Sequence, residues 1–169
     1  CWGDGSNAAN GSSVDDVDRP AVVLEGRPIQ KVSVGDKFGC ILFGNATLQC
    51  WGANDAGQLG PTAVSEPNSL VLKPIPFDKD VIDVDLGEHH ACVLLKDGEA
   101  YCWGSNANKQ IHDSLIVEFA TPQLISDGPF VSIVAGDQHS CALDADGTAY
   151  CWGQANRVGT DLEGIGHEA

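Results

Sequence analysis

The sequence predicts an all-β protein built from repeated sheets. Short stretches of alternating apolar residues, bounded by Gly, Pro, Asn and Asp, recur along the chain. No stretch has apolar residues at the spacing of about 3.6 residues that is typical of an amphipathic helix. The triplet Cys-Trp-Gly also recurs at a period of about fifty residues. Similar sheets stacked around an axis cover one another without helices, so we predict a β-propeller, with an open β-solenoid as the competing architecture.

The best-defined element is a β-hairpin that runs from Cys141 through Cys151. Its three-residue loop ends in Asp146-Gly147, where glycine tolerates the positive φ that such a loop requires. This loop places Cys141 directly opposite Cys151, at a Cα separation of about 4.5 to 5.5 Å that a disulfide can span. We therefore predict a disulfide that closes the hairpin.

The same hairpin occurs twice more, and each copy is predicted to hold one disulfide. The predicted pairs are Cys40 with Cys50, Cys92 with Cys102, and Cys141 with Cys151. Cys1 has no partner in the segment, because the matching cysteine would lie about ten residues before it. We therefore expect this chain to be part of a longer protein. The approximate repeats are residues 4–52, 53–104 and 105–153, with partial repeats at 1–3 and 154–169.

Each repeat is predicted to contain the same elements in order. Residues 4–19 are small, polar and acidic and are predicted to be a loop, and Pro20 to Leu24 is predicted to be a short outer strand. An inner strand, a tight bend and the hairpin follow in every repeat. The bend has a glycine five residues before the first cysteine, at Gly35, Gly87 and Gly136. Proline-containing segments at 72–77 and 121–125 are predicted to supply a fourth strand.

Side-chain alternation places apolar groups on both faces of each sheet. In the second hairpin Cys92 and Leu94 share one face, whereas Val93 and Leu95 lie on the other. The triplet tryptophans have the same phase in every repeat, which indicates a structural core rather than a ligand site. These core residues are Trp2, Trp51, Trp103 and Trp152.

The charge of the chain limits its partners. Nine Lys and Arg stand against 24 Asp and Glu, which gives a net charge of −15, and the sequence has no basic stripe. We therefore expect neither nucleic acid nor an anionic membrane surface as a partner. No apolar stretch has the length of a membrane-spanning helix.

The cysteines predict an oxidising compartment, because such bonds do not persist in a reducing cytosol. Two N-glycosylation sequons begin at Asn10 and Asn45 and fit a secretory route. Asn45 is the better candidate because it lies at a predicted hairpin tip. We expect an extracellular or cell-surface glycoprotein.

The repeated residues resemble those of a known protein family. The pattern of apolar strand, Gly, His-Ser-Cys-Ala-Leu, Asp-Gly and Tyr-Cys-Trp-Gly between Val131 and Gly153 resembles the RCC1 (regulator of chromosome condensation 1) repeat, as does the segment CWGANDAGQLG at 50–60. The resemblance covers nearly the whole chain. It implies a seven-bladed propeller, of which this chain would supply about three and a half blades. Phe38 and Lys109 depart from the pattern, because other repeats have His and Gly there, and this weakens the prediction of tight blade junctions late in the chain.

Residue types that can bind metals or act as nucleophiles are present, but their spacing argues against metal binding and catalysis. His-x-Cys at 90–92 and 139–141 offers zinc ligands, yet the first repeat has no such His and the chain has no Cys-x₂-Cys knuckle. The stretch 144–147 resembles part of a calcium loop but lacks its final Glu. Ser140 and His139 are strand neighbours whose side chains point to opposite faces, so they cannot form a nucleophile and base pair. We expect no metal, no cofactor and no enzymatic activity, and we expect the histidines to satisfy backbone groups in the bends.

We therefore predict a non-catalytic extracellular scaffold or protein-interaction module within a larger secreted or cell-surface protein, for adhesion or for matrix or filament assembly. Its partners would be other protein domains or copies of itself, giving a homo-oligomer or filament. They would be bound by the variable loops 4–19, 53–69, 105–120 and 154–169.

Three alternatives stay open. The family resemblance implies guanine-nucleotide exchange on a small GTPase. A secreted propeller of this repeat class that inhibits β-lactamases makes a protein inhibitor an alternative. Exposed tryptophans beside carboxylates would instead indicate a carbohydrate-binding propeller.

Overall fold

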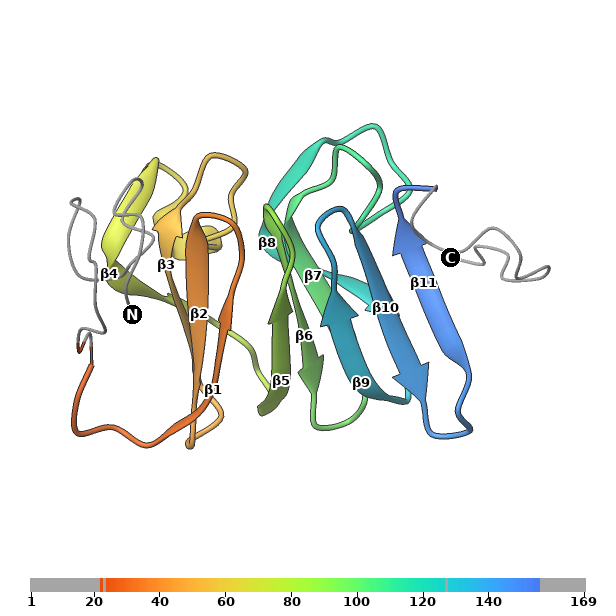
Figure 1. Ribbon diagram of the computed structural model, residues 1–169, viewed down its shortest axis with the longest axis horizontal. Helices are drawn as coiled ribbons and strands as arrows, with labels where there is room; N and C mark the ends of the chain where they lie inside the picture. Colours follow the sequence, from red (N-terminus) through yellow and green to blue (C-terminus); the bar gives the residue numbers. More distant parts are fainter. Residues whose placement is uncertain (1–21, 23, 127, 156–169) are drawn as a thin grey trace.

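The computed structural model describes residues 22, 24–126 and 128–155, which form three antiparallel sheets side by side (Figure 1). The first sheet contains β1 (Ile29–Val34), β2 (Phe38–Phe43), β3 (Leu48–Ala53) and β4 (Asn68–Ile75) in that order. The second contains β5 (Val81–Leu86), β6 (His90–Leu95), β7 (Ala100–Ser105) and β8 (Glu118–Ser126). The third contains β9 (Phe130–Ala135), β10 (His139–Asp144) and β11 (Ala149–Gly153). A single-turn 3-10 helix, η2 (Pro61–Ala63), interrupts the loop between β3 and β4. The predicted all-β architecture is confirmed.

The outer strand of a sheet follows its hairpin along the chain. Strands β4 and β8 occupy the outer edges of the first two sheets and contain Pro74 and Pro122, which edge strands tolerate. The sheets therefore run from 29 to 75, 81 to 126 and 130 to 153, out of phase with the predicted repeats.

The outer strand predicted from Pro20 to Leu24 is wrong at Val22 and Leu24, because neither residue is in a strand. The other residues of that segment lie outside the described part of the chain. Since β4 already forms the outer edge of the first sheet, Leu24 packs instead against the cluster of Ile41, Phe43 and Trp51.

The three predicted disulfides are present, and each joins directly opposed residues of one hairpin. Cys40 pairs with Cys50, Cys92 with Cys102, and Cys141 with Cys151. Their Cα atoms are 4.0 to 4.1 Å apart, closer than the expected separation. The hydrogen bond from Phe43 N to Thr47 O makes that pair a bonded one, so alternation leaves the cysteines at a non-hydrogen-bonded pair, where strands approach most closely.

The second sheet is buried on both faces. Val93, Leu95 and Trp103 contribute to the core shared with the first sheet, whereas Cys92 and Leu94 contribute to the core shared with the third. The sheets cover one another, and Ala63 of η2 adds to the core between the first two.

A tryptophan joins the second and the third sheet to the loop of the sheet before it. The indole Nε1 of Trp103 donates to the carbonyl of Gln58 at 2.9 Å, and Nε1 of Trp152 donates to the carbonyl of Gln110 at 2.8 Å. Trp51, Trp103 and Trp152 are 2%, 0% and 9% exposed, and Trp2 lies outside the described residues. The aromatic rings therefore fill the core while their N–H groups fix the position of the neighbouring loop.

The bends stack closely because they contain glycine. A Cβ atom on Gly35 would lie 2.4 Å from the carbonyl oxygen of Gly87, and one on Gly87 would lie 2.4 Å from that of Gly136. Glu88 N donates to Asp137 O at 3.1 Å across the same junction. Only glycine allows this approach of one bend to the next.

Lys109 has a left-handed backbone conformation. Its φ is 61°, and Gly57 at the equivalent position of the first loop has a φ of 75°. The junction after Lys109 keeps its bond from Trp152 to Gln110, so the substitution leaves that junction closed. The lysine is held in a conformation that costs about 1 to 2 kcal/mol for a residue with a Cβ atom.

We predict that Lys109→Gly is more stable than Lys109→Ala by about 1 kcal/mol, because glycine relieves the left-handed strain. Both variants remove the ion pair from Lys109 to Asp113, so the comparison isolates the backbone effect. Urea unfolding with the disulfides intact measures the difference. Equal stability of the two variants would show that position 109 carries no strain.

Candidate functional site

The long loops lie at one end of the sheets and the hairpin tips at the other (Figure 1). Residues 54–67 connect β3 to β4, and residues 106–117 connect β7 to β8. Both segments belong to the variable regions expected to bind partners. The structure therefore places these two candidate interaction loops at a single end, and residues 4–19 and 156–169 of the other predicted loops lie outside the described residues.

A buried asparagine organises the β7–β8 loop. The side-chain amide of Asn106 donates to the carbonyls of His112 and Ile116 at 2.9 and 2.7 Å. Its Oδ1 accepts from the backbone N–H groups of Ile111 and His112, both at 2.9 Å. One side chain thus fixes four backbone groups of the loop.

Asn54 has the same role in the β3–β4 loop. Its amide donates to the carbonyls of Ala63 and Glu66, each at 2.7 Å, and its Oδ1 accepts from Leu59 N at 2.8 Å. Sequence reasoning missed this pair of residues. The signal was the asparagine that lies two residues after Cys-Trp-Gly, at Asn54 and Asn106.

The two loops share a frame, by which we mean the hydrogen bonds from the side chain of Asn54 or Asn106 to the loop backbone. They differ at the apex. In the β7–β8 loop the apex consists of Leu115, Ile116 and Val117, residues that are 98%, 54% and 63% exposed. The backbone bonds of Asn54 and Asn106 place Ser65, Glu66 and Pro67 at the equivalent positions of the other loop. The fold therefore does not require apolar residues there. A run of exposed apolar residues on a fixed loop is typical of a protein-interaction site.

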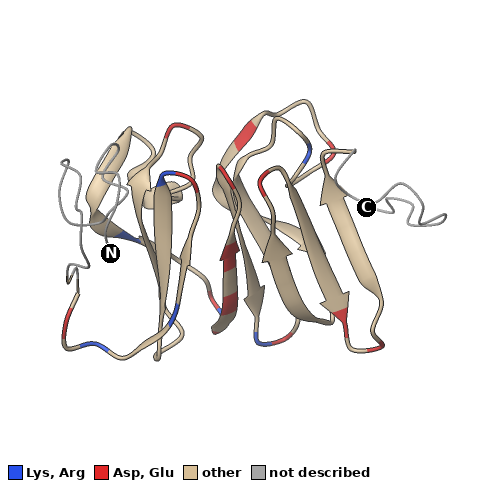
Figure 2. Ribbon diagram, viewed as in Figure 1, with Lys and Arg blue, Asp and Glu red and all other residues tan. Residues whose placement is uncertain are grey.

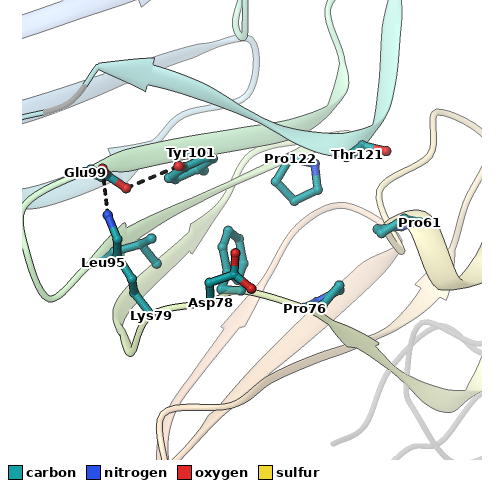
Figure 3. Close-up of a pocket in the computed structure, with 10 residues that line it drawn as sticks. Pro61, Pro76, Asp78, Lys79, Leu95, Glu99, Tyr101, Thr121 and Pro122 are labelled. Atoms are coloured by element: carbon teal, nitrogen blue, oxygen red, sulfur yellow. Dashed lines mark hydrogen bonds and ion pairs between the residues drawn. The ribbon is translucent and has the colours of Figure 1, made fainter.

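An open groove separates the first two sheets at their outer side (Figure 3). Its volume is about 340 Å³. Pro61, Pro76 and Pro122 contribute to its walls, and Phe77 packs edge-on against Tyr101 with ring centroids 5.6 Å apart. The groove thus has both apolar and charged walls and lies between the sheets, close to η2.

Lys79, in the lining of the groove, is shared between two carboxylates. Lys79 Nζ lies 2.5 Å from Asp97 Oδ2 and 2.7 Å from Glu99 Oε1, and the Tyr101 hydroxyl donates to Glu99 at 3.2 Å. These hydrogen bonds, first that to Asp97, raise the pKa of Lys79, and the bond from Lys79 lowers the pKa of Asp97. The cluster joins the start of the second sheet to its hairpin tip and has no arrangement that would activate a nucleophile.

Acidic and basic residues are scattered along the ribbon, many of them in loops and turns (Figure 2). Within the described ranges, no group of three or more His, Cys, Asp or Glu residues could hold a metal ion. None of the helices in that part of the chain is long and apolar enough to cross a membrane.

His90 forms a hydrogen bond to the next sheet. Its Nε2 lies 2.8 Å from Ser140 Oγ, and both side chains are completely buried. The expectation that this imidazole bonds backbone groups of the bend is therefore wrong, because Nε2 bonds the Ser140 hydroxyl of the neighbouring sheet and the buried Nδ1 has no hydrogen-bond partner among the described residues. At the preceding junction Phe38 and Ala91 occupy the equivalent positions within one apolar core. A buried serine without access to substrate makes this pair a structural contact.

Asn45 lies exposed at the tip of the first hairpin, in the turn between β2 and β3. Cys1 and Asn10, the other residues singled out near the start of the chain, lie outside the described residues.

Sheets of this kind, packed face to face with their inner strands adjacent, define a segment of a β-propeller. A family model described as "Regulator of chromosome condensation (RCC1) repeat" matches residues 29–58, 81–110 and 130–160, more than half of the chain. A second model with this description matches residues 97–143. The chain belongs to the RCC1 repeat family.

The E3 ubiquitin-protein ligase HERC2 of Homo sapiens is 31% identical over 124 residues, which is 72% of this chain and 3% of that protein. The structure of yeast RCC1 (Prp20) bound to Kap60 is similar with a TM-score of 0.74 and 23% identity, over 90% of this chain and 38% of that one. The ectodomain of the Physcomitrella patens receptor kinase CR4 has a TM-score of 0.53 and 20% identity, over 82% of this chain and 32% of that one. The two structures show the fold, and this chain spans only a small part of each of these proteins.

We predict that acid destabilises the protein through His90. Burial lowers the pKa of His90 to about 4, from a usual value of 6.5. Between these values the unfolded chain binds a proton that the folded chain does not, so the free energy of unfolding falls as the pH falls from about 6.5 to about 4. The loss approaches about 3 kcal/mol and levels off below the lower value.

The double variant His90→Phe/Ser140→Ala copies the pair of Phe38 and Ala91 and provides the comparison. Urea unfolding at about pH 7 and pH 4.5 should show a smaller loss of stability in the double variant. The same loss in both proteins would assign the acid sensitivity to other groups.

We predict that the frame and the apex of the β7–β8 loop differ sharply in their effect on stability. Asn106→Ala leaves buried backbone groups without partners and should lower the free energy of unfolding by about 2 to 4 kcal/mol. Leu115→Ser, at an exposed side chain, should change it by less than about 0.5 kcal/mol. Asn54→Ala is the matched control for the frame. A large loss of stability in Leu115→Ser would show that the apex packs against the fold.

Proposed function

We propose that this chain is a segment of an extracellular or cell-surface RCC1-repeat propeller that acts as a non-catalytic protein-interaction scaffold. The observation that carries the proposal is the disulfide in each sheet. Cys40, Cys50, Cys92 and Cys102 are completely buried between sheets, and their spacing places each pair at the position of closest strand approach. Disulfides built into the repeat fit an oxidising compartment, because a reducing cytosol would not maintain them.

The β7–β8 loop is the surface through which this scaffold contacts its partner. Leu115 to Val117 would enter an apolar pocket of another protein, and the exposed Glu118 beside them favours basic groups at the rim of that pocket. The net charge of −15 opposes close association of identical copies at low ionic strength, so a different protein is the favoured partner. Adhesion and matrix or filament assembly are functions that such a contact can serve.

Two relatives support parts of this proposal by likeness. The CR4 structure is that of a receptor-kinase ectodomain, so the fold occurs outside a cell. The yeast RCC1 structure is that of a complex with Kap60, so one protein that contains this fold binds another protein. The likeness to RCC1 also favours an alternative function, that of an intracellular regulator of a small GTPase. In that case the paired cysteines would be free thiols.

We predict that the thiols of the native protein are blocked before reduction. Intact mass spectrometry of protein from its natural source, alkylated with and without prior reduction, should show that the six cysteines of the three hairpins react only after reduction. The mass should also exceed the 17.7 kDa of this segment. Free thiols at all seven cysteines would overturn the extracellular proposal and favour the intracellular regulator.

A further inference from the structure

The tip of the first hairpin differs from the two others in its chemistry. All three hairpins turn through a three-residue loop whose central residue is Asn45, Asp97 or Asp146. Only the first loop has an amide at this position, and there Thr47 follows it two residues later; in the third hairpin Thr148 follows Asp146, which is not an amide. Asn45-Ala46-Thr47 is therefore the single N-glycosylation sequon among the described residues.

The turn itself does not require the amide. Asn45 Oδ1 accepts from Thr47 N at 3.4 Å, and Asp97 Oδ1 accepts from Glu99 N at the same distance. An aspartate thus makes the same local contact in the second hairpin. What asparagine adds at the first tip is a side-chain nitrogen.

That nitrogen is accessible. The Thr47 hydroxyl donates to Asn45 Oδ1 at 2.8 Å, so the amide oxygen is engaged on the side of the turn. Asn45 is exposed, and within the described residues its Nδ2 has no hydrogen bond. The group that would carry a glycan therefore points away from the contacts that hold the tip.

The position of the tip also suits a bulky modification. Gly44 N donates to Pro28 O at 2.9 Å, which holds the tip to the segment before β1. The tip lies at the end of the sheets opposite to the β7–β8 loop (Figure 1). A glycan there leaves the apex at Leu115 uncovered.

We propose that Asn45 is an N-glycosylation site. The inference rests on the proposed extracellular function, which supplies the secretory route. In the transfer, the Asn45 amide nitrogen forms a bond to C1 of an oligosaccharide carried on a polyprenyl diphosphate. The bond from C1 to the phosphate oxygen breaks, the amide loses one proton, and the polyprenyl diphosphate leaves.

The test uses the full-length protein secreted from eukaryotic cells, with peptide-N-glycosidase and peptide mapping as the probes. Mapping should find aspartate at position 45 only after enzyme treatment, and it separates this site from Asn10. Asn45→Asp keeps the acceptor that Asp97 provides in the second hairpin, so it should fold and lose the modification completely. Thr47→Val should lose it as well, whereas Thr47→Ser and Ala46→Gly keep the sequon and should retain it.

The state of the cysteines and the modification of Asn45 test the proposed function and the glycosylation site separately. Closed disulfides with an unmodified Asn45 would overturn the inference and leave the extracellular scaffold in place, as would modification of Asn10 alone. Free thiols with an unmodified Asn45 would overturn both. Because the wild-type protein is mapped directly, the result does not depend on the folding of any variant.

Discussion

The cover that each sheet receives from its neighbours is the constraint on which the rest of the structure depends. A sheet with two apolar faces has no stable place at a surface, so the second sheet must lie between the other two. The indole of Trp103 shows how this burial also fixes geometry, because its N–H donates to the carbonyl of Gln58 in the loop of the first sheet. One side chain thus contributes to the core and fixes the position of the neighbouring loop at Gln58.

The junctions are equivalent in backbone but differ in the pair that closes them. Phe38 and Ala91 make an apolar junction, whereas His90 and Ser140 make a polar one with a hydrogen bond of 2.8 Å. Exchange of a single member would leave a buried polar group without a partner, so each pair functions only as a pair. Sheets that look interchangeable in the repeat pattern are therefore matched to particular neighbours.

Local features of the fold could be predicted from the sequence, and long-range ones could not. The register of the Cys141 hairpin followed from its loop length alone, because a turn of fixed length determines every opposed pair. The contact between His90 and Ser140 joins residues fifty positions apart, and no local pattern identifies such partners. The outer strand was misplaced at Leu24 for the same reason, since the occupant of a sheet edge depends on the whole sheet.

The disulfide and the loop frame together make the apex of the β7–β8 loop a pre-organised surface. The bond from Cys92 to Cys102 closes a short hairpin and stabilises it by about 3 kcal/mol on the chain-entropy model. Strand β7 leads from that hairpin directly into Asn106, which fixes the loop at both of its sides. Leu115 is therefore held outward without packing of its own, and a partner that buries it has little conformational entropy left to remove. The same argument explains why the loop sequences differ freely at the apex, because the frame below them does not depend on what they present.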